Sequence, residues 1–157
     1  MNITTSNQVI TFEQDTKLVN NLLELLTREQ SSLVMVDVDS IEALMEEKSE
    51  LLQHINTAAK SRYAALAANG FEQNESGMTA WLKSQTKPAL NAAWDKFQQS
   101  ISQAKEMNRL NGMLISKHFH RNQQLLNHLQ GNSGAGDVYS KSGQAKSYAA
   151  SRSTLMA

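Results

Sequence analysis

The chain has 157 residues, of which 40% are hydrophobic and only 6% aromatic, with one proline and no cysteine. That length fits one domain, and a composition rich in Leu, Ala and Met favours helices over strands. Without cysteine there is no disulfide, thiolate nucleophile or cysteine-based metal site, which fits a reducing compartment. No basic patch followed by an apolar run opens the sequence, and no stretch approaches about 18 consecutive apolar residues, so we expect neither a secretory signal nor membrane insertion.

Charge is distributed unevenly although its sum is zero. Residues 1–50 contain ten acidic and three basic side chains, and residues 83–157 contain ten basic and three acidic ones. The simpler interpretation is that acidic and basic helices pack together, and the alternative is a basic surface for nucleic acid. The basic residues are spread along a helix, with few aromatic side chains among them on which bases would stack. This spacing favours the first interpretation.

The first part of the chain predicts an antiparallel helical hairpin. A first helix is expected over residues 11 to about 35, because its leucines share one face and acidic residues lie in its first turns, where the helix dipole favours them. Asp39 is the predicted N-cap of a second helix over residues 40 to about 68, with Glu42 placed as in a capping box. Asn69-Gly70 is expected to end that helix, and Phe71 to fold back on its last turn. The leucines of the first face are Leu18, Leu22, Leu25, Leu26 and Leu33.

Residues 71–87 predict a connector with a short helix capped by Ser76. Pro88 suits the first position of a third helix, which is expected to run to about Leu129 and to be roughly 60 Å long. From Gly131 onward the chain is rich in Gly, Ser and Ala and buries too little surface to offset its ordering entropy. We therefore predict an all-α fold, with an antiparallel helical hairpin plus a third long helix, as in a three-helix bundle or coiled coil. The predicted domains are a helical domain over residues 1–130 and a flexible tail over residues 131–157.

The two halves of the predicted third helix differ. The first half is a simple amphipathic helix. In the second half Leu110 and Leu114 lie about 120–160° around the helix from the line of Trp94 and Ile101, so the apolar sector is broader. A helix that is apolar on more than one side must be covered on more than one side, and three helices do not easily supply that cover. The second half therefore predicts a surface for a partner. The apolar residues of the first half are Leu90, Trp94, Phe97, Ile101 and Ala104.

The sequence predicts no enzyme, no metal site and no cofactor. None of the four histidines belongs to a Glu-x-x-His or His-Glu-x-x-His pattern. The glycine-rich phosphate loops and the Gly-x-Ser-x-Gly nucleophile turn are absent from the sequence as well. The acidic cluster of Glu46, Glu47 and Glu50 is interpreted as a solvated helix face.

The run Asn108-Arg109-Leu110-Asn111-Gly112-Met113-Leu114-Ile115, with the helical stretch that follows it, resembles the FlgN family of bacterial flagellar export chaperones. The leucine-rich opening hairpin is similar to that of the family, and residues 139–143 resemble its tail element, with Ser140 in place of a glycine. The resemblance implies a cytoplasmic type III flagellar export chaperone for helical C-terminal segments of the hook–filament junction proteins FlgK and FlgL. Such a protein keeps its clients soluble and unassembled and delivers them to the export gate protein FlhA. A homo-oligomer in the client-free state is compatible with the resemblance.

Client binding is expected of residues in and after this run. Gly112 removes a side chain where another backbone could come close, and asparagines could fix register as single polar groups do in coiled coils. The alternative is that the asparagines are solvent-exposed and Gly112 lies at a kink. Tyr139 is expected to dock on the export gate, because it is the best anchor in an otherwise polar tail. The expected client-binding residues are Asn108, Leu110, Asn111, Gly112, Leu114, Ile115, Phe119 and Leu126.

Two other functions compete with this one. A self-associating coiled-coil adaptor or structural protein needs apolar heptads sustained along the third helix, and the asparagine-rich segment interrupts them. A nucleic-acid binder, the less favoured of the two, would use the basic residues of the same helix. Those residues are Lys96, Lys105, Arg109, Lys117 and Arg121.

Overall fold

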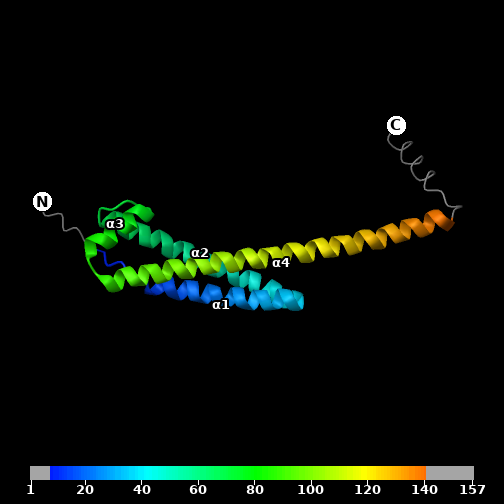
Figure 1. The fold of residues 1–157 in the computed structure, drawn as a ribbon, viewed down its shortest axis with the longest axis horizontal. Helices are drawn as coiled ribbons and strands as arrows, with labels where there is room; N and C mark the ends of the chain where they lie inside the picture. Colours follow the sequence, from blue (N-terminus) through cyan, green and yellow to red (C-terminus); the bar gives the residue numbers. More distant parts are fainter. Residues whose placement is uncertain (1–7, 141–157) are drawn as a thin grey trace, which may run out of the picture. The chain divides into compact units, whose positions relative to one another are not determined.

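The computed structural model describes residues 8–140, with side chains placed for residues 8–131. The described residues form helices α1 (Glu13–Met35), α2 (Val38–Ala68), α3 (Glu75–Gln85) and α4 (Pro88–Ser140), and no strand (Figure 1). The predicted all-α fold is therefore confirmed. The chain divides after Leu114 into two compact units, which are described separately below. Within the described residues, none of the helices is both long and apolar enough to cross a membrane.

Helices α1 and α2 form the antiparallel hairpin and lie side by side (Figure 1). All five leucines of the predicted face of α1 are buried, which confirms that the apolar spacing of this helix was interpreted correctly. On α2 only Leu44 and Leu66 are buried, whereas Met45 and Leu52 are exposed. The second helix therefore buries only a few of its apolar side chains.

The turn between α1 and α2 begins the second helix earlier than predicted. Val36 adopts the left-handed conformation, with φ 56°, and its N–H donates to the Leu33 carbonyl. Asp37 then caps α2: its carboxylate accepts hydrogen bonds from the N–H and the hydroxyl of Ser40, at 3.2 and 2.7 Å. These hydrogen bonds hold the pKa of Asp37 below its usual value. The prediction of Asp39 as the cap was wrong. It did not anticipate that Val36, a β-branched residue, adopts the left-handed conformation and lets the helix begin directly after Asp37.

The end of α2 follows the sequence prediction, and the start of α3 does not. Gly70 has φ 82°, and the Phe71 N–H donates to the Leu66 carbonyl at 3.0 Å, so the chain folds back as expected. Helix α3 is capped by Asn74, whose side-chain oxygen accepts from the Gly77 N–H at 2.7 Å. Ser76 lies inside the first turn of α3, so the prediction of Ser76 as the cap was wrong. Asn is as good an N-cap as Ser, and Asn74 stands three residues before the N–H that it reaches.

An aromatic cluster fastens α3 to the open end of the hairpin. The ring of Trp94 lies 5.0 Å from that of Phe12 and 5.5 Å from that of Phe97, measured between ring centroids. The apolar residues Met78, Trp81 and Leu82 of α3 are all buried in this cluster, which explains why a short helix is ordered here. The buried members are Ile10, Phe12, Leu66, Met78, Trp81 and Leu82.

Helix α4 is longer than predicted. It continues to Ser140, although the glycines and serines after Leu129 predicted an end there. A glycine inside a helix costs about 1 kcal/mol relative to alanine but keeps its backbone hydrogen bond, which a proline would remove. Residues 141–157 lie outside the described residues, so the predicted division into a domain and a flexible tail stays a prediction.

Candidate functional site

The first part of α4 packs on the hairpin through the face that its sequence predicts. Phe97 and Ala104 are buried. Ala104 belongs to a core cluster with Leu22 and Leu26 of α1, and Met107 packs against the same cluster. The predicted amphipathic pattern of this half is therefore confirmed, and its apolar face is used inside the unit that ends at Leu114.

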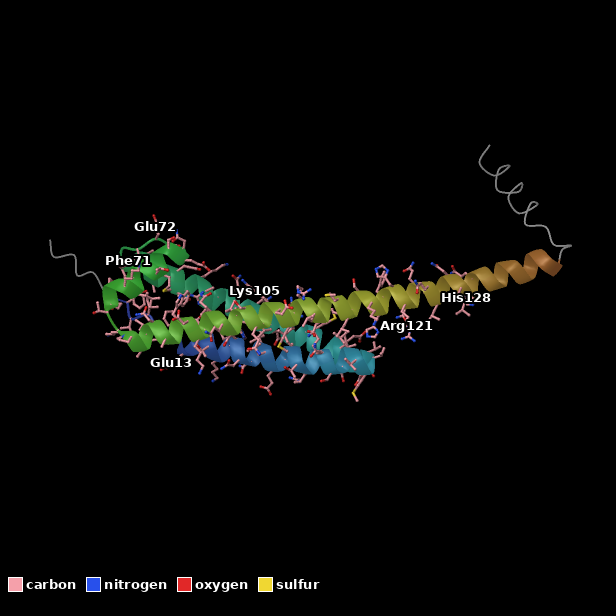
Figure 2. The ribbon with its side chains drawn as sticks, in the orientation of Figure 1. Glu13, Phe71, Glu72, Lys105, Arg121 and His128 are labelled. Atoms are coloured by element: carbon pink, nitrogen blue, oxygen red, sulfur yellow. The ribbon has the colours of Figure 1, made fainter. Side chains whose placement is uncertain are left out.

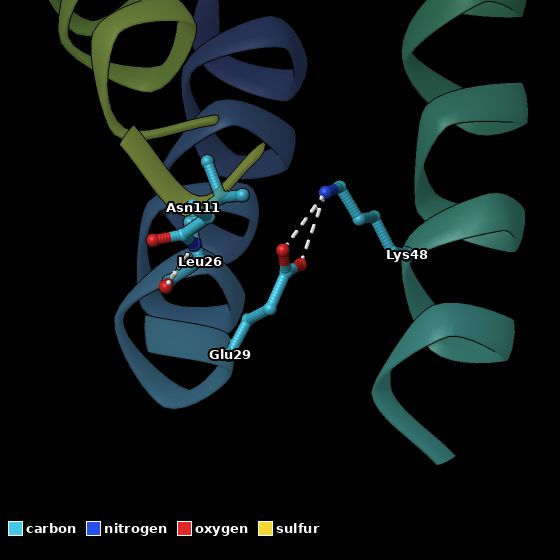
Figure 3. Close-up of polar contacts among 4 residues, drawn as sticks. All are labelled: Leu26, Glu29, Lys48 and Asn111. Atoms are coloured by element: carbon cyan, nitrogen blue, oxygen red, sulfur yellow. Dashed lines mark hydrogen bonds and ion pairs between the residues drawn. The ribbon is translucent and has the colours of Figure 1, made fainter. Parts of the chain in front are cut away.

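Asn111 is fully buried and joins α4 to α1 (Figure 3). Its side-chain N–H donates to the Leu26 carbonyl at 2.9 Å, while its side-chain oxygen is buried without a hydrogen-bond partner among the described residues. Asn111 thus fixes the register of α4 on α1 and does not present its amide on the surface. The sequence spacing indicates this burial, since Asn111 follows the buried Phe97 and Ala104 at intervals of seven residues, nearly two helical turns.

A second buried polar contact holds the same region together. The Lys48 ammonium of α2 donates to both carboxylate oxygens of Glu29 on α1, at 3.0 and 3.2 Å (Figure 3). Glu29 is only 3% exposed, so its charge is compensated within the hairpin. The sequence carries no local signal for this pair, because its partners lie on different helices. Together with Asn111, it makes the hairpin a defined support for the first half of α4.

Four other predicted client-binding residues lie on α4 before the unit boundary. Leu110 is 38% exposed and Leu114 is half-buried. Asn108 and Gly112 are exposed, and a Cβ added at Gly112 would have no neighbouring atom within 4 Å. The helix runs through Gly112 without interruption, so this glycine does not break it. Gly112 therefore lies on an open surface of the helix, and its role in client binding stays a prediction.

The unit that begins at Ile115 carries the remaining predicted residues, and all of them are exposed. Ile115, Phe119 and Leu126 are 47%, 64% and 57% exposed. Leu125 and Leu129, which the prediction did not include, are exposed to a similar degree. At about 100° per residue these five side chains fall within a sector of about 120° on one side of the helix. We call the predicted apolar residues Leu110, Leu114, Ile115, Phe119 and Leu126 the α4 stripe; by the same helical count Leu110 and Leu114 lie about 100–180° around the helix from the other three.

Polar residues occupy the other side of the same helical segment. Arg121 and His128, labelled in Figure 2, extend from α4. By the same helical count they lie roughly opposite to Phe119 and Leu126. This segment is therefore amphipathic, and the large side chains of its apolar side are 47–64% exposed. An uncovered apolar surface of this extent is typical of an interaction site.

The basic residues of α4 do not form one patch. By helical count Lys105 and Lys117 lie on different sides of the helix. The Arg109 guanidinium forms an exposed ion pair with Glu106 at 2.7 Å, which raises the pKa of Arg109 and lowers that of Glu106. A cation that is held by its own carboxylate neighbour is a poor phosphate ligand. The arrangement therefore does not favour nucleic-acid binding.

Two further predictions concern chemistry and export. Among the described residues no three His, Asp or Glu side chains come close enough to hold a metal ion. The backbone of Tyr139 lies in α4, but its side chain is outside the described side chains, so its role at the export gate stays a prediction.

Comparison with known families gives one match. The family model described as FlgN protein matches residues 1–147 of the chain. Comparisons with curated proteins and with solved structures gave no match.

Proposed function

The chain belongs to the FlgN family of flagellar export chaperones, and on that premise we propose that it is a cytoplasmic chaperone of the junction proteins FlgK and FlgL. It binds their helical C-terminal segments, keeps them soluble and unassembled, and delivers them through type III export to the gate protein FlhA. The family is one of chaperones rather than enzymes. The observation that carries the proposal is the exposure of Ile115, Phe119 and Leu126 of the α4 stripe, which are 47%, 64% and 57% exposed.

An amphipathic client helix would cover this stripe. Burying apolar surface contributes about 25 cal/mol per Å², so a few large side chains supply most of the affinity. Gly112 lets the client backbone approach closely, and Asn108 offers an exposed amide beside it. Asn111 contributes indirectly, because its hydrogen bond to Leu26 holds α4 on the hairpin. The client-binding residues proposed here are therefore the α4 stripe with Asn108 and Gly112.

The test is a charge introduced into the stripe. The variant Leu114→Asp with Ile115→Asp should lower the affinity for purified FlgK and FlgL at least tenfold in isothermal titration calorimetry. The matched control is Met35→Asp with Met45→Asp, which places the same charges on exposed apolar residues of the hairpin. Circular dichroism identifies variants that fail to fold. Wild-type affinity in a folded stripe variant contradicts the proposal.

Tyr139 is proposed to dock on the export gate. Tyr139→Ala should leave client affinity unchanged and weaken binding to the cytoplasmic part of FlhA in a pull-down assay. Tyr148→Ala is the matched control, since it removes the same side chain a few residues further along the chain. Deletion of residues 131–157 should likewise spare client binding and impair export. Unchanged export by the deletion variant contradicts this role.

A self-associating adaptor is the second candidate, because a second copy of the chain would also cover an exposed apolar stripe. The two functions differ in what happens when FlgK is added. A chaperone exchanges contacts between its own copies for the client, so the mass from light scattering should fit a complex with one chaperone copy. A permanent adaptor keeps its oligomeric mass at every concentration and in the presence of FlgK.

A further inference from the structure

The beginnings of α1 and α4 form a groove of about 830 Å³, and the surface discussed above does not include it. Its apolar lining comes from Ala89, Leu90 and Ala93 of α4 and from Phe12, which is itself only 3% exposed. All of its lining residues belong to the unit that ends at Leu114. The two helices begin at the same end of this unit, so their first turns form the two walls (Figure 1).

Three lysines border the groove and only one acidic residue does. Lys17 of α1, Lys96 of α4, and Lys87 just before α4 are exposed, and none of them forms an ion pair within the described residues. Glu13 is the one carboxylate among the lining residues. The groove therefore combines an apolar floor with an excess of positive charge.

The position of Lys87 is unfavourable for α4 itself. The N-terminus of a helix carries a partial positive charge, which stabilises acidic side chains there by about 0.3–1 kcal/mol and disfavours basic ones. Helix α4 has no acidic residue in its first turn, and Lys87 directly precedes it. The Lys87 carbonyl accepts hydrogen bonds from the N–H groups of Leu90 and Asn91, but its ammonium group cannot accept one as an N-cap side chain does. Local choices that oppose stability are expected at binding sites, and an anionic guest would reverse this unfavourable charge.

The size of the walls suits a helix. The lining residues run from Thr11 to Asn21 at the start of α1 and from Lys87 to Lys96 at the start of α4, which is eleven and ten positions. At 1.5 Å per residue that is about 14 Å, or between two and three helical turns. Amphipathic helices bind such grooves through residues at i, i+3, i+4 and i+7.

We propose that this groove binds an acidic amphipathic helix of a partner protein. The apolar face of that helix packs on Leu90, Ala89 and Ala93, and its carboxylates pair with Lys17, Lys87 and Lys96. The site is separate from the α4 stripe, so the chaperone can hold this partner and a client at different surfaces. The inference does not depend on the proposed client.

The probe is a fluorescein-labelled peptide of 18 residues with leucines at i, i+3, i+4 and i+7 and glutamates on the flanking positions. Fluorescence anisotropy with the full chain should show micromolar binding that weakens as salt is raised, because the charges are exposed. A second peptide with lysine in place of every glutamate should bind at least tenfold more weakly. A third peptide with serine in place of every leucine tests the apolar floor and should also lose binding.

Two variants locate the binding site. Lys17→Glu with Lys96→Glu should weaken the acidic peptide at least tenfold, whereas the control Lys60→Glu with Lys105→Glu changes the net charge equally on exposed lysines elsewhere. Ala93→Trp fills the groove without changing charge and should also remove binding. The stripe variant Leu114→Asp with Ile115→Asp should bind the acidic peptide as the wild type does, which separates this site from client binding.

Several results overturn the proposal. Equal binding of acidic and basic peptides removes the role of the lysines, and equal losses in the groove and control variants show that only net charge matters. If the stripe variant no longer binds the acidic peptide, the peptide binds on the α4 stripe and not in the groove. If the chain forms a dimer that dissociates in the variant Lys17→Glu with Lys96→Glu, the occupant of the groove is a second copy of the chain. That result also contradicts a partner helix.

Discussion

Two stretches of α4 have similar apolar content and opposite surroundings. In the first, Phe97 and Ala104 are 3% and 4% exposed. In the second, Phe119 and Leu126 are 64% and 57% exposed. The second stretch has the broader apolar sector in the sequence, and the structure buries large apolar side chains of the first stretch and leaves those of the second exposed. The first stretch contributes to stability, and the second is available to a partner.

The same substitution in both stretches gives the largest expected contrast. Phe97→Ala should lower the free energy of unfolding by about 3–5 kcal/mol, because it removes a buried aromatic side chain and leaves a cavity. Phe119→Ala should change it by less than about 0.5 kcal/mol, as for other exposed positions. Urea denaturation followed by circular dichroism measures both. Equal losses would mean that Phe119 is covered within the free chain.

A buried ion pair beneath the first stretch gives the next largest effect. Arg62 pairs with Asp15 at 2.6 Å, and its guanidinium lies 5.1 Å from the centroid of the Phe97 ring. Arg62→Met leaves the Asp15 carboxylate buried without a partner and should cost about 3 kcal/mol at neutral pH. Arg28→Met removes an exposed pair with Glu47 and is the control, with an expected loss below about 1 kcal/mol.

The pH dependence of that loss follows from Asp15. Burial raises the pKa of the Asp15 carboxyl from its usual 3.8, against the opposing attraction of Arg62. Because the pKa of Asp15 is higher in the folded state, the ionised carboxylate lowers the free energy of unfolding at higher pH. This destabilisation disappears as pH falls through the folded-state pKa. The cost of Arg62→Met should therefore shrink on acidification toward pH 4. A cost that grows on acidification contradicts the raised pKa.

Much of this fold could be predicted from helical spacing. The buried leucine face of α1 follows from that spacing, and the fold-back at Phe71 follows from the Asn69-Gly70 signal. Contacts between helices could not be predicted in the same way, since the Asp15–Arg62 pair joins residues 47 positions apart. The exposure of Phe119 was expected from the broad apolar sector, but the full burial of Asn111 was not. Its seven-residue spacing from Ala104 was the available signal.

Asn111 lies between the two stretches of α4, near the point where buried apolar residues give way to exposed ones, and it is fully buried. Its buried side-chain oxygen has no partner among the described residues, so Asn111→Leu removes an unsatisfied polar group and should raise the free energy of unfolding by about 1 kcal/mol. Asn111→Ala loses the hydrogen bond to Leu26 and leaves a small cavity, and should lower it by about 1 kcal/mol. Urea titration of both variants measures the difference. A destabilised leucine variant indicates that a water molecule satisfies the oxygen.

The smallest expected effect concerns the cap of α2. Asp37→Ala should destabilise the protein at neutral pH, whereas Asp39→Ala should not, because only Asp37 accepts hydrogen bonds from Ser40. The pKa of Asp37 is lowered from its usual 3.8, so its contribution is present above that value and is lost as pH falls through the lowered pKa. Thermal unfolding of both variants at several pH values measures this. The opposite order of the two variants at neutral pH assigns the cap to Asp39.

The central claim is that a client covers the exposed apolar side of α4. The most direct measurement is photo-crosslinking to FlgK from a benzoylphenylalanine placed at Phe119, compared with the same group at Met35, which is 81% exposed on the hairpin. The account predicts a crosslink to the C-terminal segment of FlgK from position 119 and none from position 35. Equal yields from the two positions, or a crosslink from position 35 alone, would contradict it.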